Sequence, residues 1–173
     1  MIEVYLRALE NRLMQKAEVK LVDHWNNQPA NYENEKNILP AVYIDFGGIQ
    51  WAKEGSNIKV AKATINIHCV NKNTRPTDNR EEEKDGKRLK RFDLTASVLA
   101  ALDGFSTKDG NGNVIIQSML LAGSEMDTNH DALTDDVLSF SCLLYYYNTW
   151  NDKATLEAVI ESLTLKRVDT LPA

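Results

Sequence analysis

Between Ala61 and Cys69 the sequence alternates strictly between apolar and polar residues. The odd positions carry alanine, isoleucine or cysteine, and the even positions carry Lys62, Thr64, Asn66 and His68. A period of two residues is that of a β-strand, because successive side chains point to opposite faces of a sheet. One apolar and one polar face predict a strand of an antiparallel sheet, with one side against a core and the other toward solvent.

Three further strands are predicted. Ala41–Phe46 follows a proline, which the start of a strand tolerates, and is closed by two glycines. Val114–Leu121 follows the turn sequence Lys108–Asn113 (KDGNGN), which predicts a hairpin tip. In the last strand, Leu133–Tyr147, one face is apolar and carries Leu138, Phe140, Cys142, Leu144 and Tyr146. A small extra strand is expected near Ile49–Trp51, and the polar segment Asn26–Asn37 predicts a loop.

Apolar residues at three- and four-residue spacing predict three helices. The first opens the chain, with the stripe Ile2, Leu6, Leu9, Leu13 and Ala17. The second spans roughly Arg80–Leu102, or starts near Lys87 because Gly86 disfavours a helix interior, and its stripe is Leu89, Phe92, Ala96, Leu99 and Leu102. The third, Asp152–Arg167, would be a C-terminal extension.

The predicted order of elements is α-β-β-α-β-β-α. Two pairs of strands separated by a long helix predict an α+β fold with a mostly antiparallel sheet of four to five strands and helices packed on one face. A length of 173 residues is typical of a single domain, so we expect residues 1–173 to form one.

Composition restricts the class of partner. A net charge of −5 argues against non-specific binding to nucleic acid, which needs clustered positive charge. The charged N-terminus is unlike a signal peptide and the apolar runs are too short to cross a membrane, so we expect a soluble protein made in the cytoplasm. Cys69 and Cys142 lie in apolar strands, which favours buried free thiols, with a disulfide between adjacent strands as the alternative.

No motif of catalysis or of metal binding is complete. Asp127, Asn129 and Asp131 match the start of a calcium loop, but Ala132 and Leu138 replace its glycine and its bidentate glutamate. His68 and Cys69 would point to opposite faces of a strand, which disfavours a shared zinc ion. Asp135 and Asp136 would also face opposite ways, and we expect them to be solvated. We therefore expect no cofactor, no metal and no enzymatic activity.

Charge is sorted along the chain. A basic cluster on the second helix contains Lys84, Lys87, Arg88 and Arg91, whereas residues 109–152 contain no lysine or arginine and carry Asp127, Asp131 and Asp135. The basic cluster has two interpretations. It is the solvated side of an amphipathic helix, or it contacts the acidic segment of another copy in a head-to-tail ring.

Two polar surfaces have alternative interpretations. Tyr145 and Tyr147 are expected on the second face of the last strand, where a protein partner or cross-strand packing explains them equally well. They would serve a small protein-binding adaptor module. The polar face of Thr64, Asn66 and His68 is the place where an enzyme on this fold would hold a general base.

Five segments resemble the tail-completion or tail-terminator proteins of long-tailed bacteriophages. They are the opening helix, the proline-led strand LPAVYIDF, the strand ATINIHCV, the mid-chain helix LKRFDLTASVLAAL and the region SEMDTNHDALTDDVLSFSCLLYY. The resemblance covers roughly Met1–Trp150. Helix Asp152–Arg167 has no clear counterpart, and the loop Asn26–Asn37 is extended.

The resemblance implies a structural virion protein that caps the tail tube and later joins tail to head. It implies a homo-oligomer, a ring of six, with tail tube subunits on one side and a neck or connector protein on the other. An acidic inner wall that includes Asp127 and Asp131 would suit the passage of DNA without sequence-specific binding.

Overall fold

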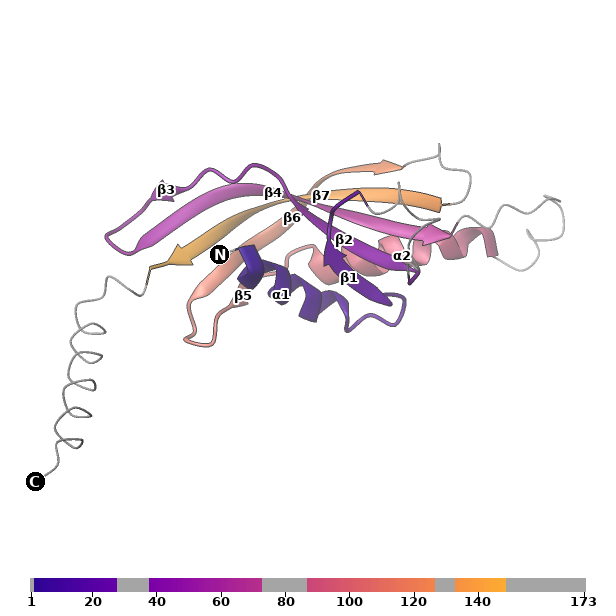
Figure 1. Cartoon of the computed structure of the whole chain (residues 1–173), viewed down its shortest axis with the longest axis horizontal. Coiled ribbons are helices and arrows are strands. Elements are labelled where there is room, and N and C mark those ends of the chain that lie inside the picture. The colour runs from indigo at the N-terminus through magenta and orange to yellow at the C-terminus, as the bar shows by residue number, and fades with distance from the viewer. Residues whose placement is uncertain (1, 28–37, 73–86, 127–132, 149–173) are drawn as a thin grey trace, which may run out of the picture.

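The structure, a computed structural model, describes residues 2–27, 38–72, 87–126 and 133–148. In these residues one strongly curled sheet carries two helices on one face (Figure 1). The helices are α1 (Ile2–Leu13) and α2 (Lys87–Leu102). The strands are β1 (Leu21–His24), β2 (Ala41–Phe46), β3 (Ala52–Lys53), β4 (Ile58–Lys72), β5 (Thr107–Lys108), β6 (Val114–Met126) and β7 (Leu133–Tyr147).

The strand order is β1-β2-β4-β7-β6-β5, with β3 paired to β4 beside this path. The centre of the sheet is the antiparallel pair β4–β7, which is continuous from Ile58 opposite Tyr147 to Lys72 opposite Leu133. β1 is parallel to β2, and the other pairs are antiparallel. The prediction of a mostly antiparallel α+β fold with helices on one face is confirmed for the described residues.

The number of strands was underestimated. The sheet has seven strands in the part of the chain described, where four to five were predicted. β1, β3 and β5 are four, two and two residues long, which is too short to show a period of two in the sequence. Each forms because an adjacent strand offers free backbone groups: β3 pairs with β4, β5 with β6, and β1 with β2.

The main core lies between the helices and the apolar faces of β2, β4, β6 and β7. Phe140, Ile65 and Ile67 are fully buried in it, and Ile65 lies opposite Phe140 in the register of β4 and β7. The alternation predicted for β4 and β7 therefore places the expected apolar faces against the helices. Cys69 and Cys142 are both buried and free, as the favoured interpretation predicted.

The buried stripe of each helix differs from the predicted one. In α1 Tyr5 is buried together with Leu9 and Leu13, whereas Ile2 is 43% exposed. Tyr5 is accepted in the core because its hydroxyl donates a hydrogen bond to the backbone carbonyl of Tyr145 at 2.8 Å. In α2 the stripe is rotated to Leu94, Val98, Ala101 and Leu102, whereas Ala96 is exposed. The predicted helix Asp152–Arg167 lies outside the described residues.

The turn between β5 and β6 is built around one carboxylate. Asp109 Oδ1 accepts hydrogen bonds from the backbone N–H groups of Asn111 and Asn113 at 2.9 and 2.8 Å, and Oδ2 accepts one from the Asn113 amide at 3.1 Å. Gly112 adopts a φ of 85°, which a side chain would disfavour. The hairpin tip predicted from KDGNGN is confirmed.

Asp109→Ala is expected to destabilise the protein at neutral pH, and by less in acid. The side-chain and backbone hydrogen bonds from Asn113 lower the pKa of Asp109 from its ordinary value. A lowered pKa contributes stability that is present above the pKa of the unfolded chain and is lost as the pH falls through the folded value. Urea denaturation at several pH values measures the free energy of unfolding. The difference in this free energy between variant and wild type should become smaller below about pH 4. Asn111→Ala, in the same turn, is the control and should show no such narrowing.

Candidate functional site

The face of the sheet opposite the helices carries a row of hydrogen-bonded polar side chains. Asn66 lies beside Asp45 of β2 on one side and Ser139 of β7 on the other. Its amide nitrogen donates to Asp45 Oδ2 at 3.4 Å, and its amide oxygen accepts from the Ser139 hydroxyl at 2.8 Å. Asn66, one of the polar residues predicted for the open face of β4, is thus connected to both neighbouring strands.

His68 and Asp135 are joined by a side-chain hydrogen bond on the same face. Nδ1 of His68 lies 2.9 Å from Asp135 Oδ2 and 3.2 Å from Oδ1, and both side chains are only 12% exposed. Since a carboxylate only accepts, the imidazole donates from Nδ1. This contact joins β4 to β7 across 67 positions of the sequence.

Trp25 shields this pair from solvent. Its ring stacks on the His68 imidazole with centroids 3.6 Å apart and an angle of 8° between the planes. It also meets Tyr43 edge-on at 6.0 Å. Below these rings lies a second small core of Ala41, Tyr43, Val70 and Leu133, with Leu21, Trp25 and Leu39 packed against it. Trp25 was not predicted as part of any site, because it precedes a polar loop and no local pattern assigns it to β4.

The expectation that Asp135 and Asp136 are solvated is wrong. The two carboxylates do face opposite sides of the strand, but counted over the whole residue Asp135 is 8% and Asp136 6% exposed. Asp136 lies on the helix side, where the Thr95 hydroxyl of α2 donates to its Oδ2 at 3.2 Å. Both carboxylates have polar partners inside the protein, which is why burial is tolerated. Asp135, proposed from the sequence as part of an interaction surface, is therefore an internal group of the fold.

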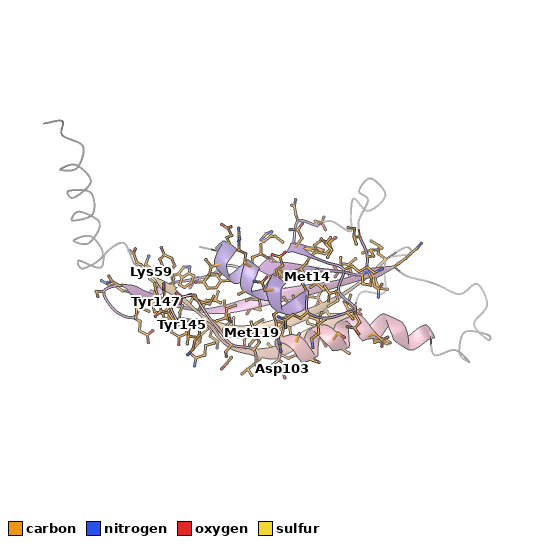
Figure 2. All side chains as sticks on the ribbon, turned by 90° about the horizontal axis from the view of Figure 1, so that it is seen from below. Met14, Lys59, Asp103, Met119, Tyr145 and Tyr147 are labelled. Carbon is orange, nitrogen blue, oxygen red and sulfur yellow. The ribbon has the colours of Figure 1, made fainter. Side chains whose placement is uncertain are left out.

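Aromatic side chains gather at the opposite end of β4 and β7. Trp51 packs between Tyr5 and Tyr146, with centroids 6.3 Å from each. Tyr145 faces the other way and donates from its hydroxyl to Gln117 Oε1 at 2.7 Å. Figure 2 shows Tyr145 and Tyr147 close to Lys59 at this end of the molecule. Both tyrosines predicted for an interface are half-buried, and Tyr145 is engaged in cross-strand contact.

We expect Tyr5 to ionise later than most of the six tyrosines of the chain. Burial, and then the neighbouring Tyr146 and Tyr147, raise the pKa of Tyr5 to about 12. A raised folded pKa gives stability that is complete below the unfolded value near 10 and is lost as the pH rises through the folded value. Phenolate absorbance during alkaline titration should show a late component that Tyr5→Phe removes. A titration unchanged by this substitution would contradict the burial of the phenol.

The remaining predicted interaction residues are only partly covered by the structure. Lys84, Asp127 and Asp131 lie outside the described residues, as does the segment that resembles a calcium loop. Lys87, Arg88 and Arg91 belong to the first part of α2, where only the backbone is described. The contact between the basic cluster of one copy and the acidic segment of another stays a prediction.

The described residues show neither a metal-binding cluster nor a membrane-spanning helix. These residues contain no group of three or more histidine, cysteine, aspartate or glutamate side chains placed to hold a metal ion. None of the helices described in the structure is both long and apolar enough to span a membrane. The polar site on the open face is thus a paired and shielded carboxylate–imidazole, with a row of amide and hydroxyl groups beside it.

Comparison with known proteins adds no relative to this description. No protein family model matches the chain, and no curated protein sequence matches it.

Proposed function

We propose that this protein is a ring-forming structural component of a long-tailed bacteriophage or prophage, which caps the tail tube and joins the tail to the head. In this role it binds further copies of itself, tail tube subunits on one side of the ring and a neck or connector protein on the other. It acts as a structural protein and not as an enzyme.

One observation carries the proposal. The five segments that resemble tail-terminator proteins form α1, β2, β4, α2 and β7, and residues from all five meet in a single core: Leu9, Ile44, Ile65, Val98 and Phe140. A shared core supports the proposal because the five segments would have to pack together in order to act as one domain.

The first experiment is the mass of the protein in solution by light scattering, across protein concentration and salt. We expect a discrete species of about six chains of 19.5 kDa, weakened by salt because the charges of the chain are sorted by segment. Electron microscopy of this species should show rings. A monomer or dimer that does not change when tail tubes are added would favour a small adaptor module and contradict the proposal.

Charge reversal at Asp127 and Asp131 tests the acidic inner wall. In a phage that carries the double substitution to lysine, assembled particles are expected to eject DNA more slowly, because positive charge on the wall would attract the phosphate backbone. An unchanged ejection rate in particles that assemble normally would show that these residues do not line the channel.

A further inference from the structure

The turn between β5 and β6 contains an asparagine that is followed by a glycine. Asn111 precedes Gly112, and no other asparagine of the chain precedes a glycine. The backbone nitrogen of the residue after an asparagine can attack the carbonyl carbon of the asparagine side chain, and a side chain on that residue hinders the attack. Because glycine has no side chain, Asn–Gly is the pair in which this reaction meets the least hindrance.

Both residues of the pair are open to solvent. Asn111 and Gly112 are exposed, and a Cβ built on Gly112 would meet no heavy atom beyond its chain neighbours within 4 Å. Figure 1 shows this turn projecting at the end of the β5–β6 hairpin. Water and hydroxide can therefore reach both the Gly112 nitrogen and the Asn111 side chain.

The neighbouring side chains of the turn are held by hydrogen bonds and are poorer targets. The Asn113 amide donates to Asp109 Oδ2 at 3.1 Å, and the branched Val114 after it hinders attack by its nitrogen. Asp109 also precedes a glycine, but hydrogen bonds from Asn113, first from its side chain, lower the pKa of Asp109, and an ionised carboxylate resists attack. Within the described residues the Asn111 side chain makes no such bond.

A backbone hydrogen bond holds the attacking nitrogen in place. The Gly112 N–H donates to the Asp109 carbonyl at 3.1 Å, so its proton is engaged while the turn is closed. The Asp109 carboxylate closes the same turn by accepting from the backbone N–H groups of Asn111 and Asn113 at 2.9 and 2.8 Å. The reaction requires the turn to open, so its rate should follow the fraction of molecules in which the turn is open.

We infer that Asn111 is a site of spontaneous deamidation whose rate is set by the turn around Asp109. Hydroxide takes the proton of the Gly112 nitrogen, which bonds to Cγ of Asn111. The bond from Cγ to the side-chain nitrogen breaks, and ammonia leaves with a proton from water. Water then opens the resulting succinimide ring at either carbonyl, which gives aspartate or isoaspartate. This inference goes beyond the proposed function and does not depend on it.

The modification alters the turn in which it occurs. Either product adds a negative charge two positions from the Asp109 carboxylate, within residues 109–152, which contain no lysine or arginine. Isoaspartate also adds an atom to the main chain between Asp109 and Asn113. The backbone donors that now share Asp109 Oδ1 would then no longer both reach it, so conversion should weaken the hairpin tip.

Mass spectrometry tests the site. Trypsin should release residues 109–153 as one peptide, because no lysine or arginine occurs before Lys153. After incubation of the folded protein at mildly alkaline pH, this peptide should gain about 1 Da, and fragmentation should place the gain at residue 111. Asn111→Ala should abolish it, and Asn113 is the internal control. No gain at residue 111, or an equal gain at residue 113, would overturn the inference.

Asp109→Ala tests whether the turn sets the rate. The substitution removes the carboxylate and leaves Asn111 and Gly112 in place, so deamidation in buffer should be about fivefold faster, the effect of losing one net hydrogen bond. In urea, where neither protein has the turn, variant and wild type should react at the same rate.

The matched control is His68→Ala, which removes a hydrogen bond of β4 and leaves the turn intact. It should deamidate at residue 111 at the wild-type rate in buffer. Equal acceleration by His68→Ala would show that unfolding of the whole domain limits the reaction, and no acceleration by Asp109→Ala would show that the turn does not limit it. Either result would overturn the role assigned to the turn.

Discussion

Phe140→Ala is expected to lower the free energy of unfolding by about 3–5 kcal/mol. Phe140 has no exposed surface and lies at the middle of β7, between Ile65 of β4 and Leu121 of β6. Its removal leaves a cavity where the two long strands and the helices meet, and the sheet cannot collapse to fill it. Because domains of this size are stable by about 5–15 kcal/mol, the variant should be partly or wholly unfolded near physiological temperature.

Urea denaturation followed by circular dichroism measures this loss. Leu143→Ala is the matched control, since it lies on the same strand, faces away from the core and is 37% exposed. It should change stability by less than about 1 kcal/mol. Equal losses in the two variants would contradict the assignment of the apolar face of β7 to the core.

Asp135→Ala is expected to cost about 2–3 kcal/mol, because it leaves the His68 imidazole shielded by Trp25 without its partner. His68 Nδ1 and Asp135 Oδ2 are 2.9 Å apart without an intervening group, and both side chains are 12% exposed. A substitution on β7 should therefore change the environment of Trp25, which stacks on His68, and tryptophan fluorescence should report it.

A double-mutant cycle with His68→Ala isolates the pair. The loss of unfolding free energy in the double variant should be smaller than the sum of the losses in the two single variants. The reason is that each single variant leaves one buried polar group without its partner, whereas the double variant removes both. Asp93→Ala removes an exposed carboxylate on α2 and should have little effect. Additive losses at His68 and Asp135 would show that the two side chains do not stabilise each other.

The central strands could be predicted because their signal is local. The bounds of β2 and β7 agree with the prediction, and β4 contains the predicted alternation and extends it to Ile58–Lys72. A strand with one buried face must alternate, so the pattern is written in adjacent residues. The hairpin around Asp109 was equally visible, because its carboxylate bonds to residues only two and four positions away.

The faces of the helices were less well determined. α2 carries two neighbouring apolar stripes, and the choice of Leu94 and Val98 over Phe92 and Ala96 depends on where the helix meets the sheet. In α1 the choice of Tyr5 over Ile2 depends on a carbonyl 140 positions away. The helical period alone identifies an amphipathic helix. It does not decide which of two adjacent apolar stripes faces the core.

The sequence by itself determined that the chain is an α+β protein with long antiparallel strands, and it favoured buried free cysteines over a disulfide. Only the tertiary structure decided that Asp135 is an internal partner of His68, that Trp25 covers this pair, and that β1 and β5 end the strand order of the described residues. The physical reason is distance along the chain. Periodicity is a property of neighbouring residues, whereas the pairing of strands and the burial of a charge depend on groups that meet only after the chain has folded.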